Sequence, residues 1–230
     1  MEEKIIRKRS QLGLESKYNL MDKLAILLRT HKETKYLCSS TSVAYRVAGL
    51  CDLAINKYIE VRSGQVNVIK SHNNPILNDF LIKIAQVNGN PIDVIKSLNG
   101  EKRKENSIKN LKTKLYKEID KYDVIIKEKG YFQNKIILKD NEVWKKIFDD
   151  VVDQCINNKI SLDTKVLLLC LEYINDLHDI LIHLPKVKAD HVLNAITEVR
   201  SELINNSFSK GDELVYSFMK YLCRNKIFIF

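Results

Sequence analysis

Only seven glycines and three prolines interrupt a chain of 230 residues, and this scarcity of turn-forming residues constrains the fold more than any other feature. Leu, Lys and Glu, which favour helices, are abundant. Hydrophobic residues make up 45% of the chain, enough for one continuous core at this length. The sequence therefore predicts a mainly α fold, a single-domain helical bundle.

Apolar residues recur at three- and four-residue spacings, which is typical of amphipathic helices. On this basis we expect helices over residues 19–31, 40–57, 75–87, 91–98, 107–127, 143–158, 162–182, 187–205 and 211–223. Asn19 is suited to cap the first helix, and Pro91 to begin the fourth. The helix 162–182 is apolar on nearly all sides, which predicts that it is the buried centre of the bundle.

Two segments predict small β-hairpins. Residues 58–69 alternate apolar and polar side chains around Ser63-Gly64, and residues 131–138 follow Gly130. A glycine-containing two-residue turn between alternating runs is a typical hairpin signal. With the two helices before it, the first hairpin gives the order of a winged-helix-like unit.

The N-terminal residues 1–18 are polar and basic and are expected to form a flexible arm, followed by a helical domain over residues 19–230. The arm contains adjacent Arg7, Lys8 and Arg9. No apolar stretch approaches the roughly 20 residues that cross a bilayer, and the N-terminus lacks the apolar region of a signal peptide. We expect a protein that is neither secreted nor transmembrane, so that any membrane contact is peripheral.

The net charge of +9 attracts anionic partners, and both nucleic acid and anionic lipid are candidates. The five cysteines are far apart and form no CxxC pair, which predicts structural thiols in a reducing compartment. No metal site and no cofactor is expected.

Motifs with transferable catalytic geometry are missing from the sequence: a P-loop, a dinucleotide-binding glycine motif, a nucleophile elbow and HExxH. The best catalytic candidates are His178 and His183 with nearby Asp176, Asp179 and Glu172. His178 and His183 are five residues apart, which does not place two metal ligands on one helix face. The sequence predicts a protein that is not an enzyme.

Four segments, in order, resemble motifs of the Golgi phosphoprotein 3 family. Residues 20–28, LMDKLAILL, resemble its opening helix, and residues 44–59, AYRVAGLCDLAINKYI, resemble its next helix with the motif LRG. Residues 91–98 stand where the family has WIELLSG, and residues 128–132, EKGYF, resemble LVEKGVL. The order and spacing of these segments over about residues 19–200 carry the resemblance.

The resemblance implies a peripheral adaptor that binds phosphatidylinositol 4-phosphate on the cytosolic face of Golgi membranes. It also implies coatomer and the cytosolic tails of glycosyltransferases as partners in vesicle-mediated transport and retention. A homo-oligomer is a further possibility. If the organism has no Golgi, the expected location is simply cytoplasmic.

By resemblance, the headgroup-binding arginine of the LRG motif falls on Arg46, and its aromatic partner falls near Leu37, beside the candidate Tyr36. The family's paired arginines on the helix before EKG are replaced by lysines. These headgroup candidates are Lys114, Lys117 and Lys121. Lys binds phosphate as a point charge without the bidentate fork of Arg, so weaker or less selective headgroup binding is expected.

The second hairpin corresponds to the element that family members insert into the lipid, with Phe132 and Ile136 expected around its tip. The arm residues Arg7, Lys8 and Arg9 correspond to the family's coatomer-binding arm. Two other interpretations remain open: a nucleic-acid-binding, winged-helix-like protein, and a purely structural interaction protein. Against nucleic acid, the helix 40–57 carries only Arg46 and Lys57 as cations.

Overall fold

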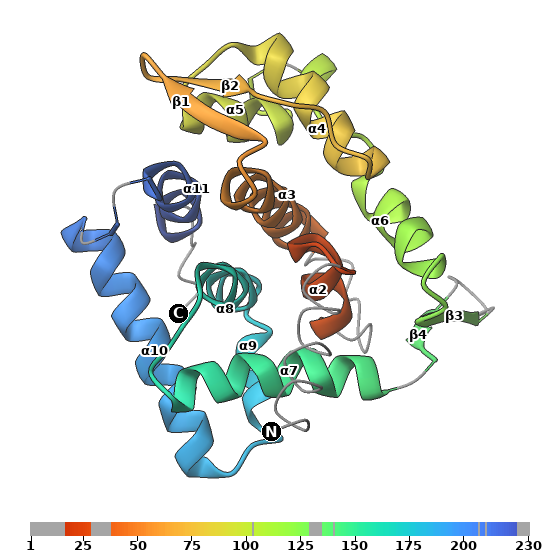
Figure 1. Cartoon of the computed structure of the whole chain (residues 1–230). Coiled ribbons are helices and arrows are strands. Elements are labelled where there is room, and N and C mark those ends of the chain that lie inside the picture. The colour runs from red at the N-terminus through yellow and green to blue at the C-terminus, as the bar shows by residue number, and fades with distance from the viewer. Residues whose placement is uncertain are drawn as a thin grey trace, which may run out of the picture.

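A computed structural model of the chain describes residues 17–28, 38–102, 104–128, 135–139, 141–206, 208, 209 and 211–224. It confirms a mainly α fold with two small β-hairpins (Figure 1). The helices are α2 (Leu20–Leu27), α3 (Cys38–Ile55), α4 (Pro75–Val87), α5 (Pro91–Leu98), α6 (Leu111–Asp120), α7 (Asn141–Ile156), α8 (Leu162–Ile174), α9 (Leu177–Leu181), α10 (Lys186–Asn205) and α11 (Glu213–Arg224). The strands are β1 (Ile59–Arg62), β2 (Gln65–Val68), β3 (Ile125–Glu128) and β4 (Lys135–Leu138).

The core is built around α3 and α8, which lie side by side in the middle of the molecule (Figure 1). Helix α8 contacts α2, α3, α9, α10 and α11, and its run from Val166 to Leu171 is entirely buried. This confirms the prediction that the Leu-rich helix is the centre of the bundle. Trp144 of α7 donates from Nε1 to the Leu27 carbonyl at 3.1 Å and so ties α7 to the end of α2.

Asparagine side chains begin three of the helices. Asn19 accepts from the backbone N–H of Asp22 at 3.0 Å, and the Asp22 carboxylate accepts from the Asn19 N–H at 3.2 Å, which makes a capping box. Asn74 and Asn90 also accept from backbone N–H groups in the first turns of α4 and α5, and each is followed by proline as the first helical residue. The predicted bounds of α4 and α5 are confirmed to the residue.

The first predicted hairpin is also confirmed. Strands β1 and β2 pair antiparallel from Ile59 opposite Val68 to Arg62 opposite Gln65. Ser63 and Gly64 between them both have positive φ, of 51° and 78°, as the favoured two-residue hairpin turn requires.

The second hairpin begins earlier than predicted, and the expectation of a helix over 107–127 is wrong. Helix α6 ends at Asp120, and Asp123 then takes a left-handed backbone, with φ of 57°. Strand β3 follows and pairs with β4, Ile125 opposite Leu138 and Glu128 opposite Lys135. The β-branched run beginning at Val124 favours a strand over a helix, which accounts for the difference. Ile136 therefore lies within β4, not at the tip.

The expected helix 162–182 is divided in two. Asn175, with φ of 65°, ends α8 in a left-handed conformation, and α9 restarts at Leu177. Asparagine tolerates this conformation better than most residues, so it acts here as a helix stop. Within the described residues, no helix is both long and apolar enough to cross a membrane.

Candidate functional site

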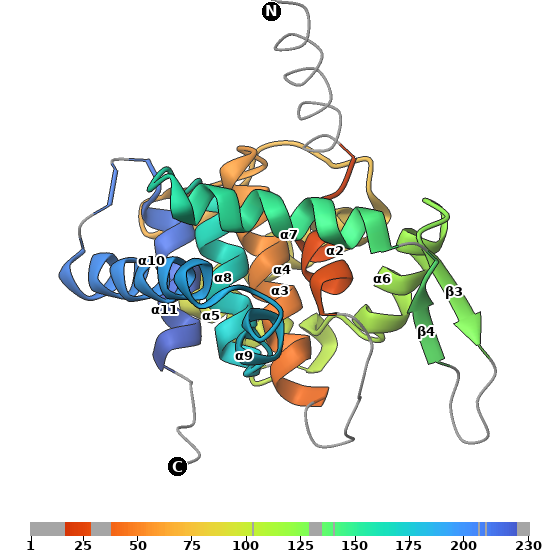
Figure 2. The same ribbon diagram turned by 90° about the horizontal axis from the view of Figure 1, so that it is seen from below.

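Helix α6 presents the three predicted lysines to solvent. Its buried side, formed by Leu111, Leu115 and Ile119, fixes the helix on the bundle. The opposite side carries what we call the α6 lysine face, consisting of Lys114, Lys117 and Lys121. These positions are three and four residues apart, so they share one side of the helix. The helix leads directly to the β3–β4 hairpin at the edge of the molecule (Figure 2).

Two of these lysines have carboxylate partners close by. Lys114 Nζ lies 2.5 Å from Asp79 Oδ2 of α4, and Lys121 Nζ lies 2.7 Å from Glu118 Oε1. Lys117 has no ion pair with any residue that the structure describes. Exposed ion pairs contribute at most about 1 kcal/mol, so an arriving phosphate can replace either carboxylate at low cost.

The surrounding sequence concentrates positive charge in this region. Residues 101–121 contain eight basic and four acidic residues, an excess of four out of the net nine positive charges of the chain. About 1 kcal/mol per basic residue near an anionic membrane surface is the usual contribution to binding. The face can therefore attract an anionic surface without any specific pocket.

Arg46 is placed differently, because it is only 8% exposed. Its Nε donates to the Leu98 carbonyl at 2.8 Å, and Nη2 donates to the Ile108 carbonyl at 2.8 Å. Nη1 donates to the Ser42 carbonyl at 2.9 Å and to the Ser42 hydroxyl. Burial lowers the pKa of this guanidinium.

The Arg46 contacts join α3 to both ends of the basic loop before α6. The Ile108 N–H also donates to the Leu98 carbonyl, at 3.3 Å, so the loop is closed at its base. Arg46 thus has a clear structural role that the sequence did not reveal. Its headgroup-binding role stays a prediction.

The other predicted site residues are only partly placed. Tyr36, Phe132 and the arm residues Arg7, Lys8 and Arg9 lie outside the described residues. Ile136 is paired with Lys127 in the hairpin. On the neighbouring strand Ile126 is 46% exposed, so the described part of the hairpin presents a single exposed large apolar side chain.

Two carboxylates, Asp22 and Asp52, are buried near the start of α2, and sequence analysis did not single them out. Asp52 Oδ2 accepts from the Leu20 N–H at 2.7 Å, while Asp22 is fully buried with Oδ1 unpaired among the described residues. Burial, aided by the negative charges of Asp52 and Glu118, raises the pKa of Asp22 to about 7. Burial also raises the pKa of Asp52. Two features of the sequence could have pointed to these buried carboxylates. Asp22 stands three residues after the Asn19 cap, and Asp52 lies within an otherwise apolar helix.

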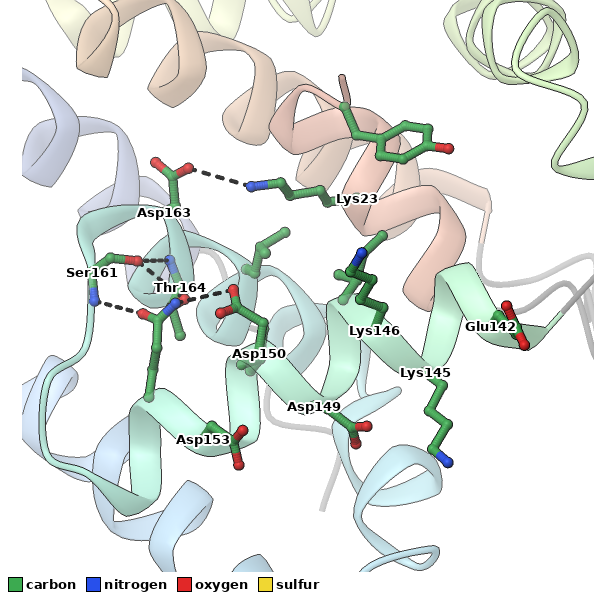
Figure 3. A pocket seen from close by; sticks show the side chains of 15 residues that line it. Lys23, Glu142, Lys145, Lys146, Asp149, Asp150, Asp153, Ser161, Asp163 and Thr164 are labelled. Atoms are coloured by element: carbon green, nitrogen blue, oxygen red, sulfur yellow. Dashed lines mark hydrogen bonds and ion pairs between the residues drawn. The ribbon is translucent and has the colours of Figure 1, made fainter. Parts of the chain in front are cut away.

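A cleft of about 710 Å³ lies between α2, α7 and α8 (Figure 3). Lys23 reaches across from α2 toward Asp163 of α8, at 3.6 Å. Carboxylates outnumber lysines among its lining side chains; these charged residues are Lys23, Glu142, Lys145, Lys146, Asp149, Asp150, Asp153 and Asp163. This excess of negative charge does not suit an anionic headgroup.

The two histidines that the sequence suggested as catalytic candidates do not line this cleft. His178 lies in α9, His183 lies in the turn after it, and neither lines the cleft. Within the described ranges no three His, Cys, Asp or Glu side chains are grouped as metal ligands. Cys51, Cys155 and Cys170 are buried, and burial raises the pKa of Cys155 to about 11, so this thiol stays protonated at neutral pH.

The winged-helix interpretation requires α3 to enter a groove of DNA. Helix α3 is instead buried from Ala44 to Ala54, packed against α2, α8 and α11. Comparison of the chain with the models of known protein families, and with curated proteins, finds no match. The resemblance to the Golgi phosphoprotein 3 family thus rests on the sequence segments quoted above.

Proposed function

We propose that the protein is a peripheral membrane adaptor that binds anionic lipid surfaces, with phosphatidylinositol 4-phosphate as its headgroup ligand. The observation that carries the proposal is the α6 lysine face, which runs along an exposed helix toward a projecting hairpin. Three lysines at about 1 kcal/mol each supply a useful but salt-sensitive attraction. The proposed mode of action is binding without chemistry.

The adaptor role at the Golgi belongs to the same proposal and is supported by the resemblance alone. In that role the lipid headgroup recruits the protein to the membrane, while coatomer and the tails of glycosyltransferases are the protein partners. A nucleic-acid role is less well supported, because α3, the helix that would read a groove, is buried in the core.

Vesicle flotation tests the lipid part of the proposal. The chain is mixed with vesicles of phosphatidylcholine alone, with added phosphatidylserine, or with phosphatidylinositol 4-phosphate at matched surface charge. We expect binding to both anionic mixtures, stronger with the phosphoinositide and weakened by salt. A duplex DNA shift assay run in parallel tests the alternative.

Two lysine variants sharpen this experiment. Changing the α6 lysine face to glutamine should reduce flotation. A matched control changes three exposed lysines on or after α7 to glutamine, namely Lys145, Lys146 and Lys159. If both variants lose binding equally, net charge alone determines vesicle binding, and the α6 lysine face is not a specific lipid-binding site. If the parent chain shifts DNA but does not float with any vesicle, the lipid proposal fails.

A further inference from the structure

Lys17 and Tyr18, the first residues that the structure describes, pack on the end of α6. The Tyr18 and Tyr122 rings meet edge to face, with their centroids 5.1 Å apart. Lys17 Nζ lies 5.3 Å from the centroid of the Tyr18 ring and 5.5 Å from that of Tyr122, which is within the range of a cation–π interaction. We call this three-residue contact the arm junction, because residues 1–16 join the fold there.

The arm junction lies beside the α6 lysine face. Tyr122 directly follows Lys121 in the chain, and helix α2 contacts α6. On the other side of the junction, the capping box between Asn19 and Asp22 fixes the backbone that leads into α2. The basic arm is therefore attached to the bundle at the end of α6 that carries Lys121.

The basic run of the arm, residues 7–9, is close enough in sequence to reach the membrane patch that the α6 lysine face would contact. Arg9 precedes Lys17 by eight residues. An extended chain spans at most about 3.6 Å per residue, so the two are separated by at most roughly 29 Å. The α6 lysine face itself extends about 11 Å from Lys114 to Lys121, at 1.5 Å per residue.

Positive charge predominates in both segments. Residues 1–17 contain five basic and three acidic residues, and residues 101–121 contain eight basic and four acidic residues. Two carboxylates at this end of α6 already have lysine partners, namely Glu118 with Lys121, at 2.7 Å, and Asp123 with Lys139, at 2.5 Å. Two positively charged segments held side by side repel each other, so a shared anionic partner stabilises their proximity.

We propose that the basic arm and the α6 lysine face bind one anionic lipid bilayer together, with the arm junction as the fixed root of the arm. The inference rests on the proposed membrane function. It assigns a lipid-binding role to Arg7, Lys8 and Arg9, in place of the coatomer-binding role that the resemblance implies. Because both segments belong to one chain, contact by α6 raises the local concentration of lipid phosphates around the arm.

Glutamine variants of the full chain test the arm by flotation with phosphatidylserine vesicles. The arm variant carries Arg7→Gln, Lys8→Gln and Arg9→Gln, and we expect it to bind about tenfold more weakly than the parent, or weaker still. The matched control changes three exposed basic residues of α10 and α11 to glutamine, namely Lys186, Lys188 and Arg224. These helices lie across the molecule from α6 (Figure 1), so at physiological ionic strength the control should bind as the parent does.

A fluorescence measurement reports contact with the lipid independently of affinity. Ser10→Trp places an indole directly after the basic run, and its emission should shift to the blue when phosphatidylserine vesicles are added. Ser201→Trp, at an exposed position of α10, should show no shift. The single natural tryptophan, Trp144, is buried and gives a constant background.

The outcomes separate this inference from the proposed function. If the parent floats, the arm variant floats equally well and the Ser10→Trp emission does not move, the arm does not contact the membrane, while the proposed function stands. Equal losses in the arm variant and the control mean that net charge alone acts, which also overturns the inference. If the parent binds no vesicle, the proposed function fails and the inference fails with it.

A gain of binding would overturn the inference in another way. Tyr18 also lines the cleft between α2, α7 and α8, whose lining carries more carboxylates than lysines. If the arm variant binds vesicles more tightly than the parent, the basic run is held on the protein itself and competes with the membrane.

Discussion

Charged residues of α3 and of α6 occupy opposite environments. Arg46 and Asp52 of α3 are buried and bonded to the backbone of other elements, whereas the α6 lysine face points into solvent, where two of its members pair with surface carboxylates. Removing a charge from the first region leaves buried groups without partners, which costs several kcal/mol. Removing one from the second costs the fold almost nothing. The buried charges of α3 thus contribute to stability, whereas the proposed binding surface lies on another helix, α6.

The largest effect should come from Arg46→Ala. Three backbone carbonyls lose a charged donor, and we expect the free energy of unfolding to fall by about 3–5 kcal/mol. Urea unfolding followed by circular dichroism measures this. An unchanged midpoint would mean that the contacts contribute little, and would leave headgroup binding as the main role of Arg46.

The next largest effect concerns Asp22 and depends on pH. Because burial raises its pKa from 3.8 to about 7, the folded chain retains a proton that the unfolded chain has already released. Stability should therefore fall as pH rises from about 4 to about 7. Asp22→Asn keeps an oxygen to accept from the Asn19 N–H but carries no charge, so it should gain about 2–4 kcal/mol at pH 8.

Urea unfolding of the parent and of the Asp22→Asn variant at several pH values checks this prediction. The control is Asp190→Asn, which changes an exposed aspartate of α10. Asp52, whose pKa is also raised, remains in the variant, so the pH dependence should shrink without vanishing. An Asp22→Asn chain that is less stable than the parent at pH 8 would contradict the assignment.

A smaller effect, confined to binding, is expected for the α6 lysine face. Its triple glutamine variant should bind phosphatidylinositol 4-phosphate vesicles about 30- to 150-fold more weakly, which corresponds to about 2–3 kcal/mol. Its free energy of unfolding, measured in urea, should stay within about 0.5 kcal/mol of the parent value. A large loss of stability in this variant would break the contrast between the two helices.

The smallest effect should follow from Asp79→Asn. This change frees Lys114 from its partner at 2.5 Å and removes a negative charge from the approach to a membrane. We expect binding to anionic vesicles to increase by about two- to fivefold, in keeping with the small value of exposed ion pairs. Titration with vesicles at low salt gives the clearest measurement, and weaker binding would mean that Asp79 positions Lys114 for its ligand.

The sequence predicted well those features that depend on neighbouring residues, and it predicted poorly those that depend on contacts between distant parts of the chain. Helices α4 and α5 were predicted to the residue because Asn74-Pro75 and Asn90-Pro91 cap and begin them within the local chain. The end of α6 was missed because the helical spacing of its lysines continued past Asp120, while the strand-forming run from Val124 was overlooked.

The site was predictable only where exposure follows from helix periodicity. The members of the α6 lysine face were chosen through the family resemblance, and their exposure on one side of the helix follows from their three- and four-residue spacing. Two of the carbonyls that Arg46 binds are 52 and 62 residues away, so its burial could not be inferred from the sequence. The burial of Asp22 likewise depends on the packing of α2 against α3 and α6.

The closure of the basic loop at Leu98 and Ile108 also determines where the chain can change in length. Because both ends of the loop are fixed by one guanidinium and by a backbone bond, extra residues within it would not move α5 or α6. Doubling the length of a flexible loop costs only about 0.6 kcal/mol. The second half of the loop forms a short 3-10 helix, η1 (Lys104–Asn106), which contacts α4 and α5 and buries Asn106. An epitope or a fluorescent label is therefore best inserted directly after the exposed Lys102, before this short helix.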